Sequence, residues 1–163
     1  MQAINGLISL KSSIDSTTPH LTAVLAADTS LRAPLSGEEK YERGKAFFAL
    51  IYNQHTDRVL SSMATTSGGD LSHFAISSVY GELLSEMSIL SAVETGLLEF
   101  VCCLADGLAP QAKGHFFGSR NLGASGNTMR ATIVLVDDIS RQLGVGYSWK
   151  NENFAFLEKV AAW

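Results

Sequence analysis

The chain has 163 residues, of which 46% are hydrophobic and 17% are charged, and its formal net charge is -4. This length and apolar content suffice for one domain with a sizeable core. The acidic balance and the lack of any window rich in Lys or Arg exclude a nucleic-acid partner. No apolar run approaches the roughly 20 residues that span a bilayer. No secretory leader is recognisable in the first thirty residues. We expect a cytoplasmic protein without a membrane partner, with the lumen of an organelle as the alternative location.

Residues 1–35 are rich in Ser, Thr and Ala and contain Pro19 and Pro34. Their helical repeat is weak, because only four apolar residues follow it: Ile4, Leu7, Leu10 and Ile14. We interpret this segment as an N-terminal arm with at most a short helix, preceding one domain over residues 36–163.

The first half of that domain predicts helices in sequence. Ser36 and Glu39 match a capping box, in which each residue's side chain bonds the other's backbone, and an apolar face of helical period follows. A second apolar pattern around Val59 to Met63 ends in the glycine loop 65–69. Asp70 is then expected to cap a helix over roughly 71–84.

The second half repeats these patterns. Ser91 and Glu94 form another capping box ahead of a strongly apolar helix. Pro110 suits the first turn of a helix over 110–122, and Ser125 caps a longer helix that Gly144 ends. A last helix is expected over 151–162. Since no segment alternates with a period of two, the fold class is all-α.

Phosphate-binding and metal-binding motifs are missing from the sequence. No glycine-rich loop leads into Lys-Ser or Lys-Thr, so no nucleotide cofactor is implied. The four histidines (His20, His55, His73 and His115) are scattered, and none begins a His-Glu-x-x-His motif. We therefore expect neither a cofactor nor a metal.

His115 and Glu94 are the two residues with a chemical interpretation. Gln111 and Ser119 lie one turn on either side of His115, so three polar groups share a stripe that can line a pocket. Periodicity alone favours the other interpretation of the stripe, a partly exposed helix face, because isolated histidines usually have no special role. Glu94 is explained without chemistry by its capping box, so spacing alone leaves both roles open.

Residues 38–144 resemble the carboxymuconolactone decarboxylase family, which includes small alkylhydroperoxidases. The resemblance rests on Glu42-Arg-Gly44 with Phe48-Ala-Leu-Ile-Tyr52, on Tyr80-Gly81, on Glu94, and above all on Gln111-Ala-Lys-Gly-His115 continuing to Asn121-Leu-Gly-Ala-Ser125. It implies an alkylhydroperoxidase-like helical domain of about six to eight helices that assembles as a homo-trimer or homo-hexamer. It also implies that Glu94 and His115 transfer protons near a subunit interface.

Two departures from the family pattern bear on the chemistry. Leu108 and Gln111 stand where the peroxidase branch has a Cys-x-x-Cys pair, so thiol peroxidase activity is not expected. The adjacent Cys102 and Cys103 cannot form an unstrained disulfide and are interpreted as inert thiols. The family's arginine before the glutamate is also missing, and three other arginines are candidates to replace it: Arg43, Arg120 and Arg130.

The resemblance therefore implies a cofactor-free lyase or isomerase. It would decarboxylate, or shift a proton on, a small cyclic unsaturated carbonyl compound such as a lactone. His115 would be the general acid or base and Glu94 would orient it, while Tyr80, Gln111 and Ser119 would bind the substrate. The alternative is a non-catalytic oligomeric binding or scaffold protein of the same fold, and thiol peroxidase is a third, weaker interpretation.

Overall fold

The computed structural model describes residues 2–18, 20, 34–146 and 149–163. Across these residues the protein is all-α, with seven α-helices, further 3-10 and π-helical segments, and no strand. The chain divides into two compact units, Met1–Pro34 and Leu35–Trp163. No helix in the described ranges is long and apolar enough to cross a membrane.

The first unit contains helix α1, Gln2–Thr17, which is longer than the short helix expected there. The hydroxyl-rich end does not break it, because Ser16 and Thr17 donate back to the carbonyl of Ser13. The rest of the predicted arm, residues 19 and 21–33, lies outside the described residues.

In the second unit, α3 spans Gly37–Tyr52 and begins at the predicted capping box. The backbone N–H of Glu39 donates to Ser36 Oγ, and that of Ser36 donates to Glu39 Oε2 at 2.8 Å. A short 3-10 turn, η1 (Asn53–His55), leads into α4 (Thr56–Ser67). Helix α4 ends where Gly68 takes a left-handed φ of 63°.

The predicted helix over 71–84 differs from expectation in its start and in its type. Gly69 rather than Asp70 is the capping residue, and α5 (Asp70–Phe74) continues into a π-helix, η2 (Ala75–Leu84). Helices α3 and η2 cross closely at Gly44 and Gly81. A Cβ on Gly44 would lie only 1.9 Å from the Ile76 carbonyl oxygen, so this approach requires glycine. This crossing brings Tyr80 of η2 beside the aromatic end of α3.

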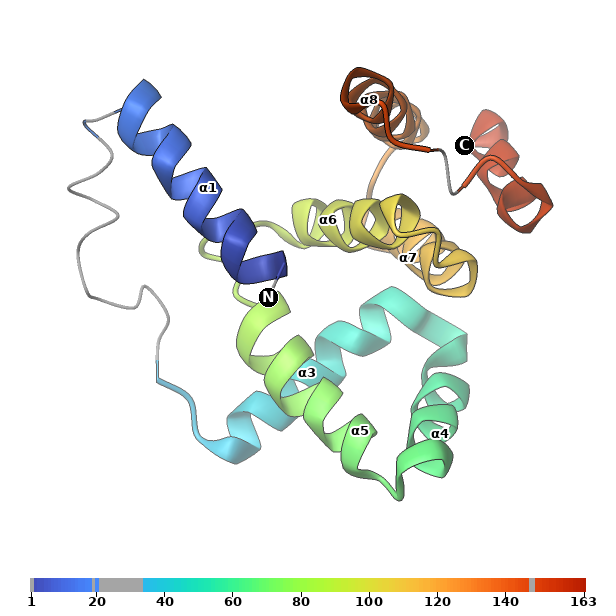
Figure 1. Ribbon diagram of the computed structural model, residues 1–163. Helices are drawn as coiled ribbons and strands as arrows, with labels where there is room; N and C mark the ends of the chain where they lie inside the picture. The colour runs from blue at the N-terminus through green and yellow to red at the C-terminus, as the bar shows by residue number, and fades with distance from the viewer. Residues whose placement is uncertain (1, 19, 21–33, 147–148) are drawn as a thin grey trace. The chain divides into compact units, whose positions relative to one another are not determined.

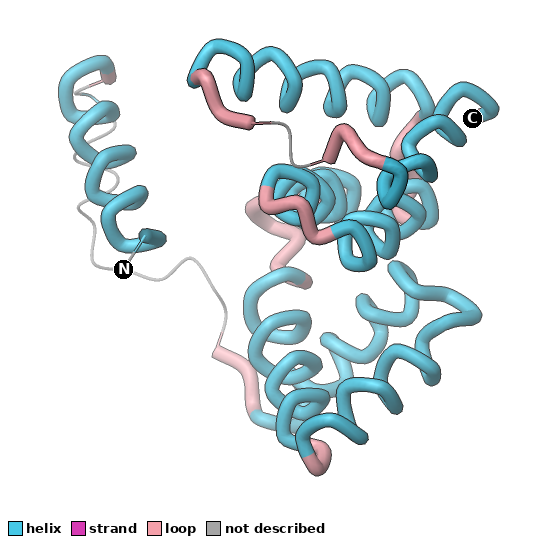
Figure 2. Tube along the Cα trace, turned by 45° about the vertical axis from the view of Figure 1, so that its right-hand side comes forward, coloured by secondary structure: helices cyan, strands magenta, loops and turns pink. Residues whose placement is uncertain are grey.

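Figures 1 and 2 show α6 (Ala92–Ala105) and α7 (Ala109–Asn121) side by side as the middle of this unit. On one side lie α3, α4, α5 and η2. On the other lie α8 (Gly126–Leu143) and a C-terminal 3-10 helix, η3 (Glu152–Ala162), where the sequence predicted a last helix over similar bounds. The capping residues Ser91 and Ser125 are those predicted.

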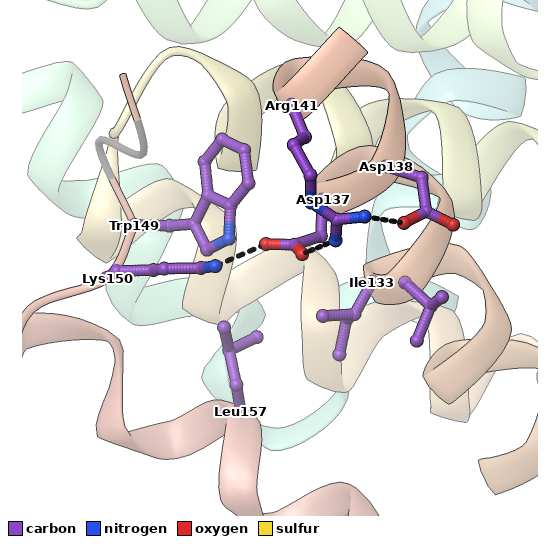
Figure 3. Close-up of a pocket in the computed structure, with 8 residues that line it drawn as sticks. Ile133, Asp137, Asp138, Arg141, Trp149, Lys150 and Leu157 are labelled. Atoms are coloured by element: carbon purple, nitrogen blue, oxygen red, sulfur yellow. Dashed lines mark hydrogen bonds and ion pairs between the residues drawn. The ribbon is translucent and has the colours of Figure 1, made fainter. Parts of the chain in front are cut away.

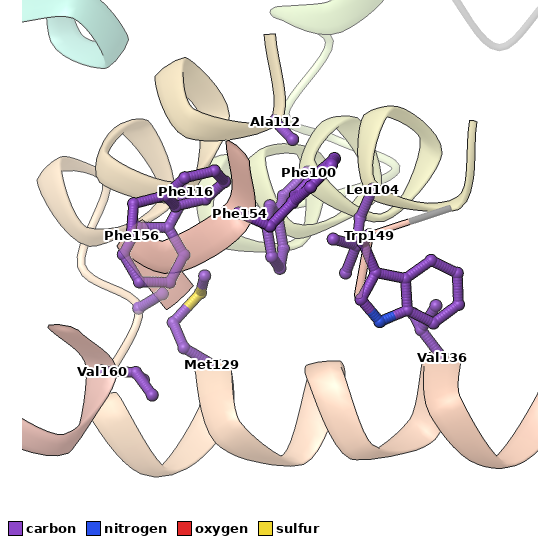
Figure 4. Packing of buried hydrophobic residues seen from close by; sticks show 11 residues of the cluster. Phe100, Leu104, Ala112, Phe116, Met129, Val136, Trp149, Phe154, Phe156 and Val160 are labelled. Carbon is purple, nitrogen blue, oxygen red and sulfur yellow. The ribbon is translucent and has the colours of Figure 1, made fainter. Parts of the chain in front are cut away.

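Two apolar cores hold these layers together. The larger packs α6 and α7 against α8 and the C-terminal segment around the fully buried Phe100, Phe116 and Met129 (Figure 4). The smaller packs α3 against η2 through Phe48, Ile51, Ile76 and Tyr80 among others. Burial of such side chains is the main favourable contribution to folding.

Candidate active site

Glu94 occupies the capping role. Its Oε2 accepts from the Ser91 backbone N–H and from the Ser91 hydroxyl, both at 2.8 Å. The residue is exposed, and these hydrogen bonds lower the pKa of its carboxyl below the usual range. The structure therefore turns Glu94 back to its own helix start and does not bring it to His115.

The carboxylate that does face His115 is Glu99, in the middle of α6. Glu99 Oε2 lies 3.6 Å from His115 Nδ1, and both side chains are about nine-tenths buried. At this distance neither atom forms a hydrogen bond with the other or with any described group. Buried polar atoms are normally hydrogen-bonded, so this facing pair marks a functional candidate.

Close helix packing creates the pair. A Cβ on Gly96 of α6 would meet Leu122 Cδ1 at 2.7 Å and Ser119 Cα at 3.4 Å, so α6 and α7 approach closely. Glu99 lies about one turn after Gly96 on α6, and His115 lies one turn before Ser119 on α7. The close contact between Gly96 and Ser119 therefore places the side chains of Glu99 and His115 against each other.

Two tyrosines continue the polar chain from the other side of His115. Tyr52, the last residue of α3, has its hydroxyl 3.5 Å from His115 Nε2 and 3.4 Å from the hydroxyl of Tyr80. The Asn121 amide donates to the Ile51 carbonyl at 2.8 Å and ties α7 to this end of α3. Four polar side chains from α3, η2, α6 and α7 thus form one line, Tyr80, Tyr52, His115 and Glu99.

The electrostatics of this line keep both phenols protonated. Burial raises the pKa of Tyr52, and the nearby Glu99 and Cys103 raise it further, while the hydrogen bond with Tyr80 lowers it. Burial raises the pKa of Tyr80 still more strongly, with Tyr52 and Glu99 adding to the shift. Each phenol therefore acts as a hydrogen-bond donor and not as a phenolate.

A groove of about 870 Å³ lies between α7 and the end of α3 with α4. Tyr52 lines it, together with an apolar surface that includes Val59, Met63 and Phe117. Its charged lining residues are Arg58 and Lys113, and no Asp or Glu lines it. The side chains that line the groove therefore carry a net positive charge, although the protein as a whole has a net charge of -4.

The other residues predicted to bind substrate fall in different environments. Gln111 is exposed and lines the groove. Tyr80 is buried behind Tyr52. Ser119 is fully buried and its hydroxyl donates to the His115 carbonyl at 2.8 Å, so it shapes the helix that carries His115. The structure thus places His115 and Tyr80 in the same line of polar side chains and places Gln111 in the neighbouring groove.

The three arginines considered for substrate recognition have structural partners instead. Arg43 donates to the Gly81 carbonyl and to Ser85. Arg120 stacks on the Trp163 ring, 4.7 Å from its centroid. Arg130 donates to the Val160 carbonyl and to Asn127. The basic groups that the groove offers are Arg58 and Lys113, which form no ion pair with the described residues.

The cysteines lie on α6, near the Glu99 end of the chain of polar groups. Cys102 is exposed and Cys103 is half-buried, and both are free thiols. Burial, and then the proximity of Cys102, Glu99 and Asp106, raises the pKa of Cys103. Its environment favours the thiol over the reactive thiolate.

A second pocket, of about 490 Å³, lies between α8 and the C-terminal segment (Figure 3). Its charges neutralise one another: Arg141 pairs with Asp137 and Asp138, and Lys150 pairs with Asp137 at 2.5 Å. The hydrogen bonds from Lys150 and Arg141 lower the pKa of Asp137. This network joins the C-terminal segment to α8. Among the described residues, no group of His, Cys, Asp and Glu is arranged to hold a metal ion.

Sequence reasoning missed Glu99 and Tyr52. Glu99 is the charged residue inside the apolar stretch 95–105, which was an available clue because an unpaired carboxylate is rarely buried. Tyr52 gave no such clue, since an aromatic residue at a helix end is common, and its role depends on the meeting of α3 and α7.

The fold and site define an all-helical protein with a buried Glu–His pair connected to an electropositive groove through a tyrosine. The chain is similar to peroxisomal protein 2 of Schizosaccharomyces pombe, with 31% identity over 120 residues, covering 74% of this chain and 56% of the relative. It is also 30% identical to peroxisomal protein 2 of Saccharomyces cerevisiae over 167 residues, covering 92% of this chain and 58% of that protein. The chain thus spans a little over half the length of these curated relatives. No protein-family model matches it, and no solved structure matches it significantly.

Proposed function

We propose that the protein is a cofactor-free lyase or isomerase that transfers a proton on, or removes CO2 from, a small cyclic unsaturated carbonyl compound. The observation that carries this proposal is the buried Glu99–His115 pair, whose facing atoms have no hydrogen-bond partner. An imidazole held against a carboxylate accepts a proton and keeps the resulting charge paired, as general acid–base chemistry requires. Glu99 takes the orienting role that the family resemblance assigned to Glu94.

The groove supports a substrate with an apolar ring and a negative charge. Aromatic and aliphatic side chains cover its apolar part, while Arg58 and Lys113 can neutralise a carboxylate. Gln111 is placed to donate to a carbonyl oxygen as negative charge develops there. These residues take the place of the family arginine that the sequence lacks.

The resemblance to carboxymuconolactone decarboxylases also supports an alkylhydroperoxidase-like fold and a homo-trimer or homo-hexamer. Helix α8 exposes Leu135, Ile139 and Leu143 at four-residue spacing, a stripe suited to packing against another copy. The mass of the native protein in solution tests this directly, and a monomer at micromolar concentration contradicts it.

We place the protein in the peroxisome rather than the cytoplasm, because both relatives are named peroxisomal proteins. Fractionation of the organism's own cells, followed by immunodetection in peroxisome-rich and cytosolic fractions, measures this. Recovery in the cytosolic fraction alone contradicts the location.

The activity is tested by proton exchange in D2O. Purified protein is incubated with a panel of unsaturated lactones and cyclic enones, with and without a carboxylate, and deuterium uptake and CO2 release are followed by NMR. We expect His115→Gln and Glu99→Gln to slow exchange by about 10²-fold or more, since acid–base catalysis contributes roughly 10²–10⁴-fold.

Glu94→Gln is the matched control, because it removes a carboxylate from the same helix outside the buried chain. We expect it to leave exchange unchanged. If His115→Gln exchanges at the wild-type rate, the acid–base proposal is wrong. If the panel binds in the groove without exchange, the non-catalytic binding protein becomes the better interpretation.

A further inference from the structure

We infer that Tyr52 is the catalytic residue that contacts the substrate, and that His115 acts on the substrate through the Tyr52 hydroxyl. This rests on the proposed function and adds the group that does the transfer. Of the four residues in the buried chain, Tyr52 is the one that lines the groove, whereas Tyr80, Glu99 and His115 are buried and do not line it. A ligand in the groove therefore meets the Tyr52 phenol before it meets the imidazole.

The charge beside His115 favours one tautomer of its ring. Glu99 Oε2 lies 3.6 Å from Nδ1, beyond hydrogen-bond distance, but an ionised carboxylate there attracts a proton on Nδ1 and leaves Nε2 as the acceptor. The Tyr52 hydroxyl then donates to Nε2, and its remaining lone pairs accept from Tyr80. The result is a directed relay from Tyr80 to Tyr52, to His115 and to Glu99.

This relay suits both directions of proton transfer. When Tyr52 takes a proton from a substrate C–H, its own hydroxyl proton passes to His115 Nε2. The C–H electron pair moves into the substrate carbonyl as an enolate. The imidazolium then bears two N–H groups and one positive charge, balanced by Glu99. Return of the Nε2 proton to Tyr52 delivers a proton to another carbon of the enolate, which completes an isomerisation.

Decarboxylation uses the second half of the same cycle. Loss of CO2 leaves the bond's electron pair on the substrate as an enolate, and the Tyr52 hydroxyl protonates the carbon. His115, protonated before the step, resupplies Tyr52 and ends neutral. The phenol is suited to this because its burial disfavours a free phenolate, so it passes a proton on without storing negative charge.

The surroundings of Tyr52 hold its ring for this role. The Phe48 ring lies 4.3 Å from the Tyr52 ring, centroid to centroid. On the other helix, Gly114 faces the same ring, and a Cβ there would lie 3.4 Å from Tyr52 Cε1, in van der Waals contact with it. The ring is thus held between Phe48 and α7, with its hydroxyl 3.5 Å from His115 Nε2.

The test compares Tyr52→Phe with Tyr80→Phe in the full chain. Each variant removes one hydroxyl from the line of polar side chains and keeps the aromatic ring. In the D2O exchange assay we expect Tyr52→Phe to be as slow as His115→Gln, about 10²-fold below wild type. The double variant that combines Tyr52→Phe with His115→Gln should be no slower than either single variant, because the two groups act as a unit. Tyr80→Phe should lose less than about tenfold, since it leaves the donor to His115 in place.

A second measurement needs no substrate. In protein labelled with ¹⁵N-histidine, with the His115 signals assigned by their loss in His115→Gln, wild type should show the Nδ1–H tautomer. Tyr52→Phe should shift the Nε2 signal and mix the tautomers, while Tyr80→Phe should leave them unchanged. Such a change in the ring signals would not follow from a loss of packing alone.

The outcomes are distinguishable. Exchange at the wild-type rate in Tyr52→Phe, with His115→Gln inactive, overturns the relay and leaves the proposed function standing. Wild-type exchange in His115→Gln overturns both. If Tyr52→Phe does not fold, Gly114→Val takes its place. It keeps the phenol, but its branched side chain extends beyond a Cβ that already lies 3.4 Å from Tyr52 Cε1 and so presses on the ring. We expect about tenfold slower exchange, and an undiminished rate in that variant overturns the relay.

Discussion

The crossing of α3 and η2 gives a sharp prediction, the effect of Gly44→Ala. The new Cβ would lie 1.9 Å from the Ile76 carbonyl oxygen and 2.7 Å from the Gly81 nitrogen. Both are backbone atoms, so no side chain can rotate away, and reaching even 3.0 Å requires the helices to separate by about 1.1 Å. Overpacking by one methyl typically costs about 1–3 kcal/mol. We expect the upper end, about 3 kcal/mol, because two backbones must move.

Gly37→Ala is the matched control in the same helix. Nothing lies within 4 Å of its Cβ, and the change reduces the freedom of the unfolded chain, which stabilises by about 0.4–1 kcal/mol where the conformation allows alanine. With a urea dependence of about 1–3 kcal/mol per molar, the two variants should differ by one molar or more in unfolding midpoint. Equal midpoints would refute the close crossing, and with it the placement of Tyr80 against Tyr52.

Three further predictions concern the core, the caps and the thiols. Phe116→Ala should cost about 3–5 kcal/mol of unfolding free energy in chemical denaturation, because the ring is fully buried. Ser91→Ala should cost about 1 kcal/mol by the same assay. The hydrogen bonds from Ser91 lower the pKa of Glu94 from its usual 4.5. The stability that Glu94 contributes is therefore complete above that value and lost as pH falls through the lowered pKa. The loss should be smaller in Ser91→Ala, because alanine removes the hydroxyl donor to Glu94 and keeps the backbone donor, and acid unfolding curves that coincide would contradict it. Iodoacetamide at neutral pH should label the exposed Cys102 faster than Cys103, whose pKa is raised, as peptide mass spectrometry can measure.

Local rules predicted the helix starts well. Ser36, Ser91 and Ser125 all cap the helices assigned to them, and Gly144 ends α8 in a left-handed conformation. These features depend on a few neighbouring residues, so the sequence is sufficient. Asp70 failed as a cap because Gly69 took the position. The π-helix that follows was not predicted, since its wider turns have no simple sequence period.

The candidate site was only partly predictable. The family resemblance singled out His115, whose role spacing alone left open. The capping pattern gave Glu94 a role that the structure shows it to have, with its carboxylate turned to Ser91. The partner of His115 could not be found by spacing, because Glu99 lies on another helix, and the angle and depth at which α6 meets α7 decide which carboxylate faces the ring.

The amino-acid sequence by itself determined the all-α class and the capping residues of α3, α6 and α8, because periodicity and capping are local properties of the chain. The tertiary structure alone decided that Glu99 faces His115, that Tyr52 separates His115 from the groove, and that Arg58 and Lys113 supply its positive charge. Those relations depend on how closely helices approach. The small size of Gly44 and Gly96 permits that approach, through contacts with residues distant in sequence.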